Sequence, residues 1–178
     1  LQENIGGISM QIVKYIILFF ILVISTLIGK LMAKKYVHRL EELEDTKAAL
    51  NMLKSKIKFT YEPIPEIFDE ISKSTTKNIS SIFINAKNKL NNQTASKSWE
   101  SAVEETNCNL NEEDKKAIKT LSKLLGQTDV EGQISQIEIT ESFLENQIQE
   151  AIIERQKNEK LYTRLGTIMG MTVVIILA

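Results

Sequence analysis

The chain has 178 residues, with 22 Lys and Arg against 23 Asp and Glu, and its formal net charge is −1. A charge near zero argues against a general nucleic-acid binder, because such a protein needs a cationic excess to release counterions. One Cys and one His exclude an intramolecular disulfide framework, a Cys-rich zinc site and most catalytic triads. The composition therefore indicates one ordinary domain, with or without membrane anchors.

The first apolar segment is residues 12–29, IVKYIILFFILVISTLIG, in which Lys14 is the one charge. As a helix it would be about 27 Å long, close to the roughly 30 Å hydrocarbon thickness of a bilayer. We therefore expect a transmembrane helix over residues 10–32. A cleaved signal peptide is the alternative, but no small-residue cleavage pattern follows the apolar run. Residues 1–9 precede Met10, which is a sensible start by itself, so we interpret them as a non-native or wrongly assigned leader.

Residues 33–163 are predicted to form a compact cytoplasmic domain of about six helices. Apolar residues recur there at the spacing of one helix face, and no segment alternates with the period of two that strands require. The predicted fold class is therefore all-α, with a helical bundle between two transmembrane helices. The first helix continues out of the membrane and carries its apolar face at Leu40, Leu43, Leu50, Leu53 and Ile57.

Turn and capping residues divide this domain. Pro63 and Pro65 push the residues before them out of the helical region, so they are expected to end the first helix and to open the second. Gly126 is expected to end the helix that precedes it. The other expected helix starts are Ser74 or Thr75, Thr94 or Ser96, Asn111, and Thr128 or Asp129.

The second apolar segment is residues 165–178, LGTIMGMTVVIILA. It would be about 21 Å long as a helix, which is short for a span, and a buried core helix is the alternative. We expect a C-terminal transmembrane helix over residues 164–178. Gly166 and Gly170 have the small-residue spacing that can seat another membrane helix closely.

Cations flank the inner ends of both apolar segments. By the positive-inside rule, this places the domain between them in the cytoplasm and both termini outside. The cations also suit an anionic inner leaflet. They are Lys30, Lys34, Lys35 and Arg39 after the first segment, and Arg155, Lys157, Lys160 and Arg164 before the second.

The chain offers little chemistry. His38 and Cys108 have no partner at a metal-ligand or nucleophile–base spacing, so a surface residue and an inert thiol explain them better. The acidic run Glu112–Asp114 is typical of a solvated helix face, and no glycine-rich phosphate-binding loop occurs. We therefore predict no catalytic residue, cofactor or metal, and neither a nucleic acid nor a small-molecule substrate as a partner.

The order of several motifs resembles the stage III sporulation protein AB family of endospore-forming bacteria. Each motif is weak alone, but the ordered set covers residues 10–178 at compatible spacing. The family usually has acids at the positions of Lys54 and Lys56, so charge on that helix face differs here. The motifs are Gly29-x-x-x-Ala33-Lys34-Lys35-Tyr36-x-x-Arg39, the helix from Leu50 to Phe59 with Pro63-Ile64-Pro65, Ser98-Trp99-Glu100, Leu125-Gly126-x-x-Asp129-x-x-x-Gln133, and Asn158-Glu159-Lys160-Leu161-x-x-x-Leu165-Gly166.

The resemblance implies a multi-pass protein of the mother-cell membrane around the forespore, required for endospore formation. It implies a non-catalytic platform in a channel complex between the two cells, together with other sporulation channel membrane proteins. The domain would be similar to the inner-membrane platform of type II secretion and type IV pilus systems, which implies docking of a cytoplasmic secretion-type ATPase. The alternative is a membrane-anchored helical signalling or regulatory protein that acts by dimerisation.

Seven residues are candidates for a structural or partner-contact role. Leu125, Gly126, Asp129 and Gln133 are expected to form a corner in which the glycine ends one helix, Asp129 caps the next and Gln133 bonds back across the turn. The alternative is an exposed corner that the ATPase recognises. The other candidates are Pro63, Pro65 and Trp99.

Overall fold

The computed structural model describes residues 2–60 and 62–177, and of residues 2–12 it describes only the backbone. The predicted leader over residues 1–9 therefore has its side chains outside the described part of the chain. That interpretation stays a prediction.

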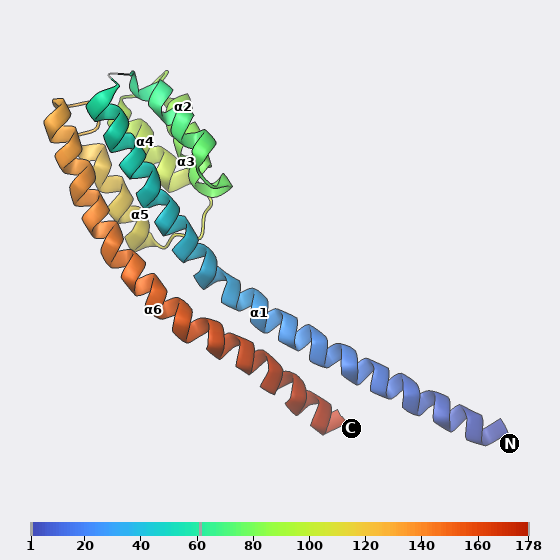
Figure 1. Ribbon diagram of the computed structural model, residues 1–178. Coiled ribbons are helices and arrows are strands. Elements are labelled where there is room, and N and C mark those ends of the chain that lie inside the picture. Colours follow the sequence, from blue (N-terminus) through green and yellow to red (C-terminus); the bar gives the residue numbers. More distant parts are fainter. Residues whose placement is uncertain (1, 61, 178) are drawn as a thin grey trace. The chain divides into compact units, whose positions relative to one another are not determined.

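The described residues form α-helices joined by short turns. The prediction of an all-α fold with a long apolar helix near each end is confirmed, and none of the residues that the structure describes is in a strand. Figure 1 labels the α-helices, and a short 3₁₀ helix follows α5. They are α1 (Gln2–Phe59), α2 (Ile64–Ser74), α3 (Lys77–Lys89), α4 (Ala95–Glu105), α5 (Glu112–Lys119), the 3₁₀ helix η1 (Thr120–Lys123) and α6 (Val130–Leu177).

The chain divides into two compact units. The bundle unit is His38–Ile152, and the paired-helix unit consists of the residues up to Val37 and those from Ile153 onward. The divisions fall inside α1 and α6, so each of these helices belongs to both units without a break. Where the membrane boundary lies along them stays a prediction.

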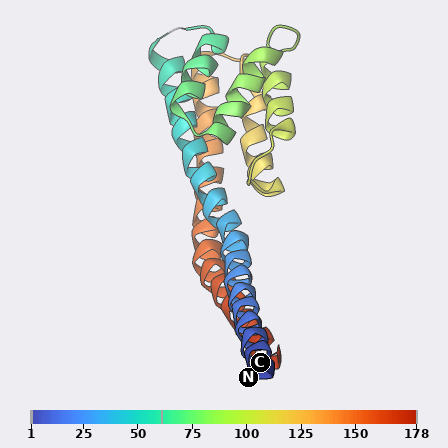
Figure 2. The same cartoon turned by 90° about the vertical axis from the view of Figure 1, so that its right-hand side faces the viewer.

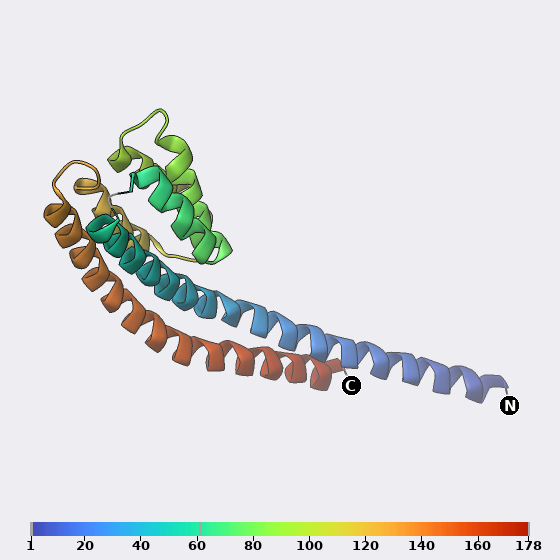
Figure 3. The same ribbon diagram turned by 45° about the horizontal axis from the view of Figure 1, so that its top comes forward.

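The core of the bundle unit is built from the apolar faces that the helical spacing predicts. In Figure 2 the short helices α2–α5 form one group, and in Figure 3 α2 and α3 run side by side. The α1 face is buried at all five predicted positions. Its partners in the core include Phe68, Ile71, Ile79, Phe83, Trp99, Ile118, Leu121, Ile137 and Leu144.

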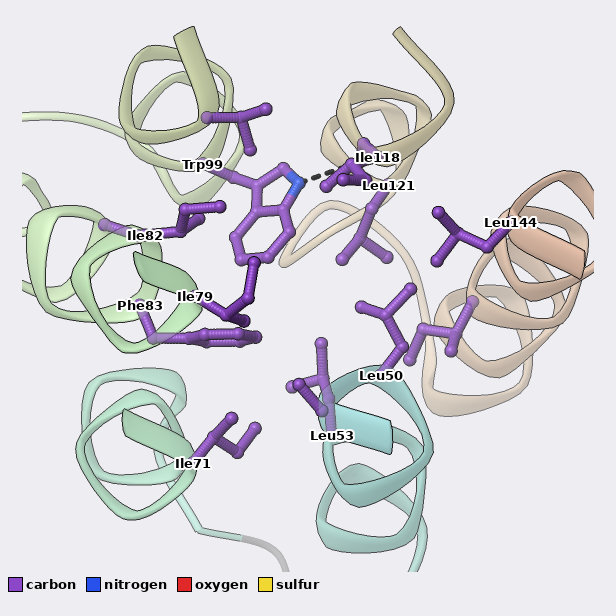
Figure 4. Packing of buried hydrophobic residues seen from close by; sticks show 14 of the residues in the cluster. Leu50, Leu53, Ile71, Ile79, Ile82, Phe83, Trp99, Ile118, Leu121 and Leu144 are labelled. Atoms are coloured by element: carbon purple, nitrogen blue, oxygen red, sulfur yellow. Dashed lines mark hydrogen bonds between the residues drawn. The ribbon is translucent and has the colours of Figure 1, made fainter. Parts of the chain in front are cut away.

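Trp99 lies in the middle of this core and is fully buried (Figure 4). Its ring centroid is 5.7 Å from that of Phe68 and 5.2 Å from that of Phe83, in tilted and edge-on contacts. Its indole Nε1 donates a hydrogen bond of 3.0 Å to the Ile118 carbonyl oxygen. One side chain therefore joins α2, α3, α4 and α5, with its polar atom satisfied.

Most helix starts follow the predicted capping residues. Thr94 accepts a bond from the Lys97 N–H, and Asn111 forms a reciprocal capping box with Asp114. The prediction of Ser74 or Thr75 as a cap is wrong, because α2 continues to Ser74 and α3 starts after Thr76.

The helix expected to run on to residue 125 also differs, because its last turn is the tighter η1. Helices often tighten into a 3₁₀ turn where they end, and here the chain reverses at Gly126 soon after.

Replacing Trp99 tests whether the core depends on this residue. Trp99→Ala is expected to lower the free energy of unfolding by about 3–5 kcal/mol, because it removes the largest buried side chain. Trp99→Phe keeps most of the packing but removes the indole hydrogen bond to the Ile118 carbonyl, which keeps its backbone bond at the end of α5, and is expected to cost about 1 kcal/mol. The measurement is denaturant unfolding of the full chain in detergent micelles, followed by circular dichroism. Phe59→Ala is the control, since Phe59 is 70% exposed, and an equal loss in all three variants would contradict the prediction.

Candidate functional site

The chain turns sharply between η1 and α6, in the segment that we call the corner, residues 124–133. Leu125 is buried in the core, and Gly126 follows it in the left-handed region with φ of 68°. A Cβ atom at Gly126 would lie 3.1 Å from Ala95 Cβ at the start of α4 and 3.4 Å from Ile64 Cδ1 at the start of α2. Glycine alone combines this backbone conformation with so close an approach at little cost.

The side chains of Asp129 and Gln133 close the corner. Asp129 Oδ1 accepts a hydrogen bond of 2.9 Å from the Gly132 N–H, which caps α6. Gln133 Oε1 accepts from the Gly126 N–H at 3.2 Å, and its Nε2 donates to the Thr128 carbonyl oxygen at 3.1 Å. The corner is therefore held by side-chain bonds to its own backbone. Recognition of the corner by a partner stays a prediction.

Apolar side chains are exposed at the end of the bundle unit that holds the corner. Phe59, the last residue of α1, is 70% exposed, and Val130, the first residue of α6, is 38% exposed. Pro63 and Pro65, at the start of α2, are also exposed. Trp99 differs from these candidates because it is fully buried, so its role is structural.

Arg39 lies inside the bundle unit, and its interpretation as a membrane-flank cation is wrong. It is 5% exposed, and it forms two hydrogen bonds of 2.8 Å to the carboxylate of Asp114 at the start of α5. A further bond of 3.2 Å joins its Nη2 to Gln147 Oε1 on α6. Asp114 is fully buried, so the interpretation of the run Glu112–Asp114 as a solvated face is wrong at this residue. Arg39 is buried because it lies one turn before Leu43, on the same buried face of α1.

Two more acids on α1 hold loops of the bundle unit, and with Arg39 we call them the polar clamp. Glu42 is 5% exposed and accepts bonds from the backbone N–H of Asn109 (2.6 Å) and from the Asn78 side chain (2.6 Å). Asp45 accepts from the backbone N–H and the hydroxyl of Thr76 at 2.8 and 2.7 Å. The starts of α3 and α5 are thus bound to α1. The clamp was not predicted from the sequence. Its signal there is the spacing of Arg39, Glu42 and Asp45, which are charged residues three apart beside the apolar face of α1.

In the paired-helix unit, α1 and α6 run side by side (Figures 1 and 3). Small residues form their contact. A Cβ atom at Gly29 would lie 3.0 Å from Gly166 Cα, and one at Gly170 would lie 3.2 Å from Ser25 Cβ. Ser25 Oγ donates a hydrogen bond of 2.7 Å to the Gly166 carbonyl oxygen. The helix that Gly166 and Gly170 were predicted to seat is therefore the first helix of the same chain.

The rest of the paired-helix unit exposes apolar surface. Both α1, from Val13 onward, and α6 are long and apolar enough to cross a membrane, and only 17% and 6% of their most apolar windows are buried. Exposed apolar surface of this extent needs a non-aqueous neighbour, so the unit is consistent with membrane association. The flanking residues Lys30, Lys34, Lys35 and Arg164 are exposed as well.

The described residues offer no metal centre, since no group of three or more His, Cys, Asp or Glu within them could hold an ion. His38 is exposed and interacts with Glu41 at 3.1 Å. Cys108 is half-buried at the edge of the core, and burial raises the pKa of its thiol, which disfavours the reactive thiolate.

Gly126 is expected to be the least replaceable residue of the corner. Gly126→Ala is expected to lower the free energy of unfolding by about 1–2 kcal/mol, because the backbone is left-handed and the new methyl group presses on Ala95. Gly126→Asn separates the cost of the left-handed backbone from the cost of the added side chain, because asparagine adopts this conformation more readily than alanine but is larger. The measurement is thermal unfolding of the full chain in micelles. Equal stability of Gly126→Ala and the wild type would contradict the prediction.

Arg39 and Asp114 are expected to depend on each other. Arg39→Met should cost about 3–5 kcal/mol of unfolding free energy, because it leaves the Asp114 carboxylate buried without its cation. Adding Asp114→Asn removes that charge and keeps an acceptor for the Asn111 N–H, so the double variant should recover part of the loss. Denaturant unfolding measures the coupling, and strictly additive losses would contradict it.

The helix contact predicts a specific cross-link. In a Cys108→Ser background, Ser25→Cys with Gly170→Cys should form an intramolecular disulfide in membranes treated with an oxidant, because the two Cβ positions are close to disulfide distance. Adding Gly166→Leu should reduce the yield several-fold. The control pair is Ile24→Cys with Met169→Cys, at residues that are 53% and 63% exposed. Equal yields from both pairs would contradict the contact.

Comparisons with known proteins give a consistent result. The family model described as stage III sporulation protein AB matches residues 14–178. A curated relative, stage III sporulation protein AB of Bacillus subtilis (strain 168), is 26% identical over 162 residues, which cover 89% of this chain and 95% of the relative.

A solved structure of stage III sporulation protein AB has the same fold. The two structures superpose with a TM-score of 0.60 at 21% sequence identity, over 65% of this chain and 94% of that one. The family model extends over nearly the whole chain, from residue 14 to the last residue. This chain belongs to the stage III sporulation protein AB family.

Proposed function

We propose that this chain is a non-catalytic membrane platform of the sporulation channel between mother cell and forespore. It docks a cytoplasmic secretion-type ATPase and contacts other membrane proteins of the channel. The observation that carries the proposal is that one helical bundle is built on two helices, α1 and α6, which both continue as apolar helices. Family membership supports the role in sporulation.

The proposed location is the mother-cell membrane around the forespore. Both apolar helices would span it, with the bundle unit in the cytoplasm and the two termini outside. The exposed Lys30, Lys34, Lys35 and Arg164 support this orientation under the positive-inside rule, which does not need Arg39.

The corner end of the bundle unit is the proposed docking surface for the ATPase. A docking surface has to keep its shape, and the bonds of Gln133 and Asp129 hold the corner in place. It also needs apolar groups that gain from leaving water, and Phe59 and Val130 are exposed there.

A binding assay tests the docking. The full chain in nanodiscs is immobilised, and the P-loop ATPase that we expect to be encoded by the neighbouring gene is titrated over it. Phe59→Asp and Val130→Glu are each expected to weaken binding at least tenfold. Ile84→Glu on α3 is the matched control, because Ile84 is 43% exposed, and it should bind normally.

Two results would contradict the proposal. No binding between two folded proteins would overturn the docking, and spore formation that proceeds normally after deletion would overturn the role.

Self-association is the second candidate function, and one observation favours it. Ile139 and Phe143 lie one turn apart on α6 and are 47% and 48% exposed. Phe143 lines a hollow of about 330 Å³ with Ala117 and Thr120. A regulator that dimerises would use such a surface. The molar mass of the protein in micelles, before and after Phe143→Asp, distinguishes this function from a monomeric platform.

A further inference from the structure

The contacts between α1 and α6 set the register of the paired-helix unit. Gly29 and Gly166 meet at backbone distance, and the rings of Tyr36 and Tyr162 stack with their centroids 5.9 Å apart. The two helices therefore run antiparallel, with residues 29–36 of α1 beside residues 162–166 of α6. Side chains in these two stretches belong to one local surface, although they are more than a hundred residues apart in the chain.

Cations from both helices gather in this register. The stretches 30–37 and 153–164 contain seven Lys and Arg against two carboxylates, Glu154 and Glu159. Arg155 is paired with Glu159 at 3.3 Å. The other six cations are exposed and lie within about two helical turns of the glycine contact or the tyrosine stack. They are Lys30, Lys34, Lys35, Lys157, Lys160 and Arg164.

Exposed apolar side chains lie directly beside these cations. Leu31 and Met32 of α1 are 62% and 52% exposed, and Leu165 and Ile168 of α6 are 44% and 58% exposed. One surface thus offers positive charge and, within a turn, hydrocarbon contact. An anionic protein or a free phosphate would use only the charged part.

The tyrosine stack lies beside cations of both helices, since Tyr36 follows Lys35 and Tyr162 lies two residues before Arg164. Tyr36 and Tyr162 are partly exposed, and tyrosine rings are enriched where hydrocarbon meets headgroups. A phenol hydroxyl can also donate a hydrogen bond to a phosphate oxygen.

From these observations we propose that the paired-helix unit binds the headgroup of an anionic phospholipid in a site formed jointly by α1 and α6. The phosphate lies among the lysines of both helices, and the acyl chains lie along the exposed leucine, methionine and isoleucine side chains. The site goes beyond the platform role and needs no ATPase. It rests only on the proposed insertion of the two helices in a membrane. An experiment that disproves ATPase docking therefore leaves lipid binding open, and the reverse also holds.

Native mass spectrometry of the full chain tests the site. The protein in a neutral detergent is mixed with equal amounts of phosphatidylglycerol and phosphatidylcholine, and the lipid retained on the protein is counted. Phosphatidylglycerol is expected to be retained at least tenfold more. Equal retention of the two lipids would overturn the proposal.

Charge variants show whether the named residues hold the lipid. Each cation near an anionic surface strengthens association by roughly fivefold, so Lys34→Gln, Lys35→Gln, Lys160→Gln and Arg164→Gln combined should abolish the preference. The matched control removes four exposed lysines of the bundle unit and should keep it: Lys77→Gln, Lys97→Gln, Lys116→Gln and Lys123→Gln. Equal loss in both variants would show a general charge effect and overturn the site.

Two further measurements separate the joint site from simpler explanations. Gly166→Leu keeps every cation but pushes the helices apart, so it should reduce the preference at least fivefold, and an unchanged preference would overturn the two-helix origin. An excess of soluble glycerol 3-phosphate should leave the bound lipid in place. Its displacement would show that the surface binds phosphate alone, which would overturn the lipid assignment. Circular dichroism checks that each variant remains helical.

Discussion

The bundle unit depends on one buried ion pair, that of Arg39 with Asp114. Two charges removed from water are costly, so each must be fully bonded. Asp114 receives both bonds of the guanidinium and also the Asn111 N–H, while Arg39 reaches Gln147 as well. Apolar packing is not directional, but a two-pronged pair has one geometry. The pair therefore sets the rotation of α1 against α5 and α6, and only in that rotation do the other residues of the polar clamp reach the loops that they hold.

The parts of this fold that follow from local rules could be predicted from the sequence, and the long-range ones could not. Helical spacing located the core face of α1, and a glycine followed by capping residues located the corner, because these signals lie within a few residues of the structure that they form. The burial of Arg39 depends on a carboxylate 75 residues away, and the start of α3 depends on Asp45, 31 residues before Thr76. At Arg39 the sequence predicted an exposed cation instead of a buried one, since a cation after an apolar segment is typical of a membrane flank.

The glycines of the paired-helix unit also show that a local sequence signal does not identify a partner that is distant in the chain. Small residues four apart identify the face of α6 that can approach another helix, but not which helix occupies it. Gly29 and Ser25 supply the complementary face on α1, and the bond from Ser25 to the Gly166 carbonyl adds a polar contact within an apolar pair. Because the face is filled by the same chain, any further helix would have to pack on the outward sides of both helices.

A net charge of −1 hides a separation of charge that bears on function. The cations of the paired-helix unit are exposed beside apolar residues, whereas several charges of the bundle unit are bonded to each other, as Lys54 is to Glu141 and Lys87 to Asp69. The bonded pairs leave little attraction for a charged partner on those faces. The corner end differs, because the groups it exposes are apolar and its backbone is held by Gln133. A partner of the bundle would therefore gain most by covering Phe59 and Val130, and lipid would gain most at the lysines of the paired helices.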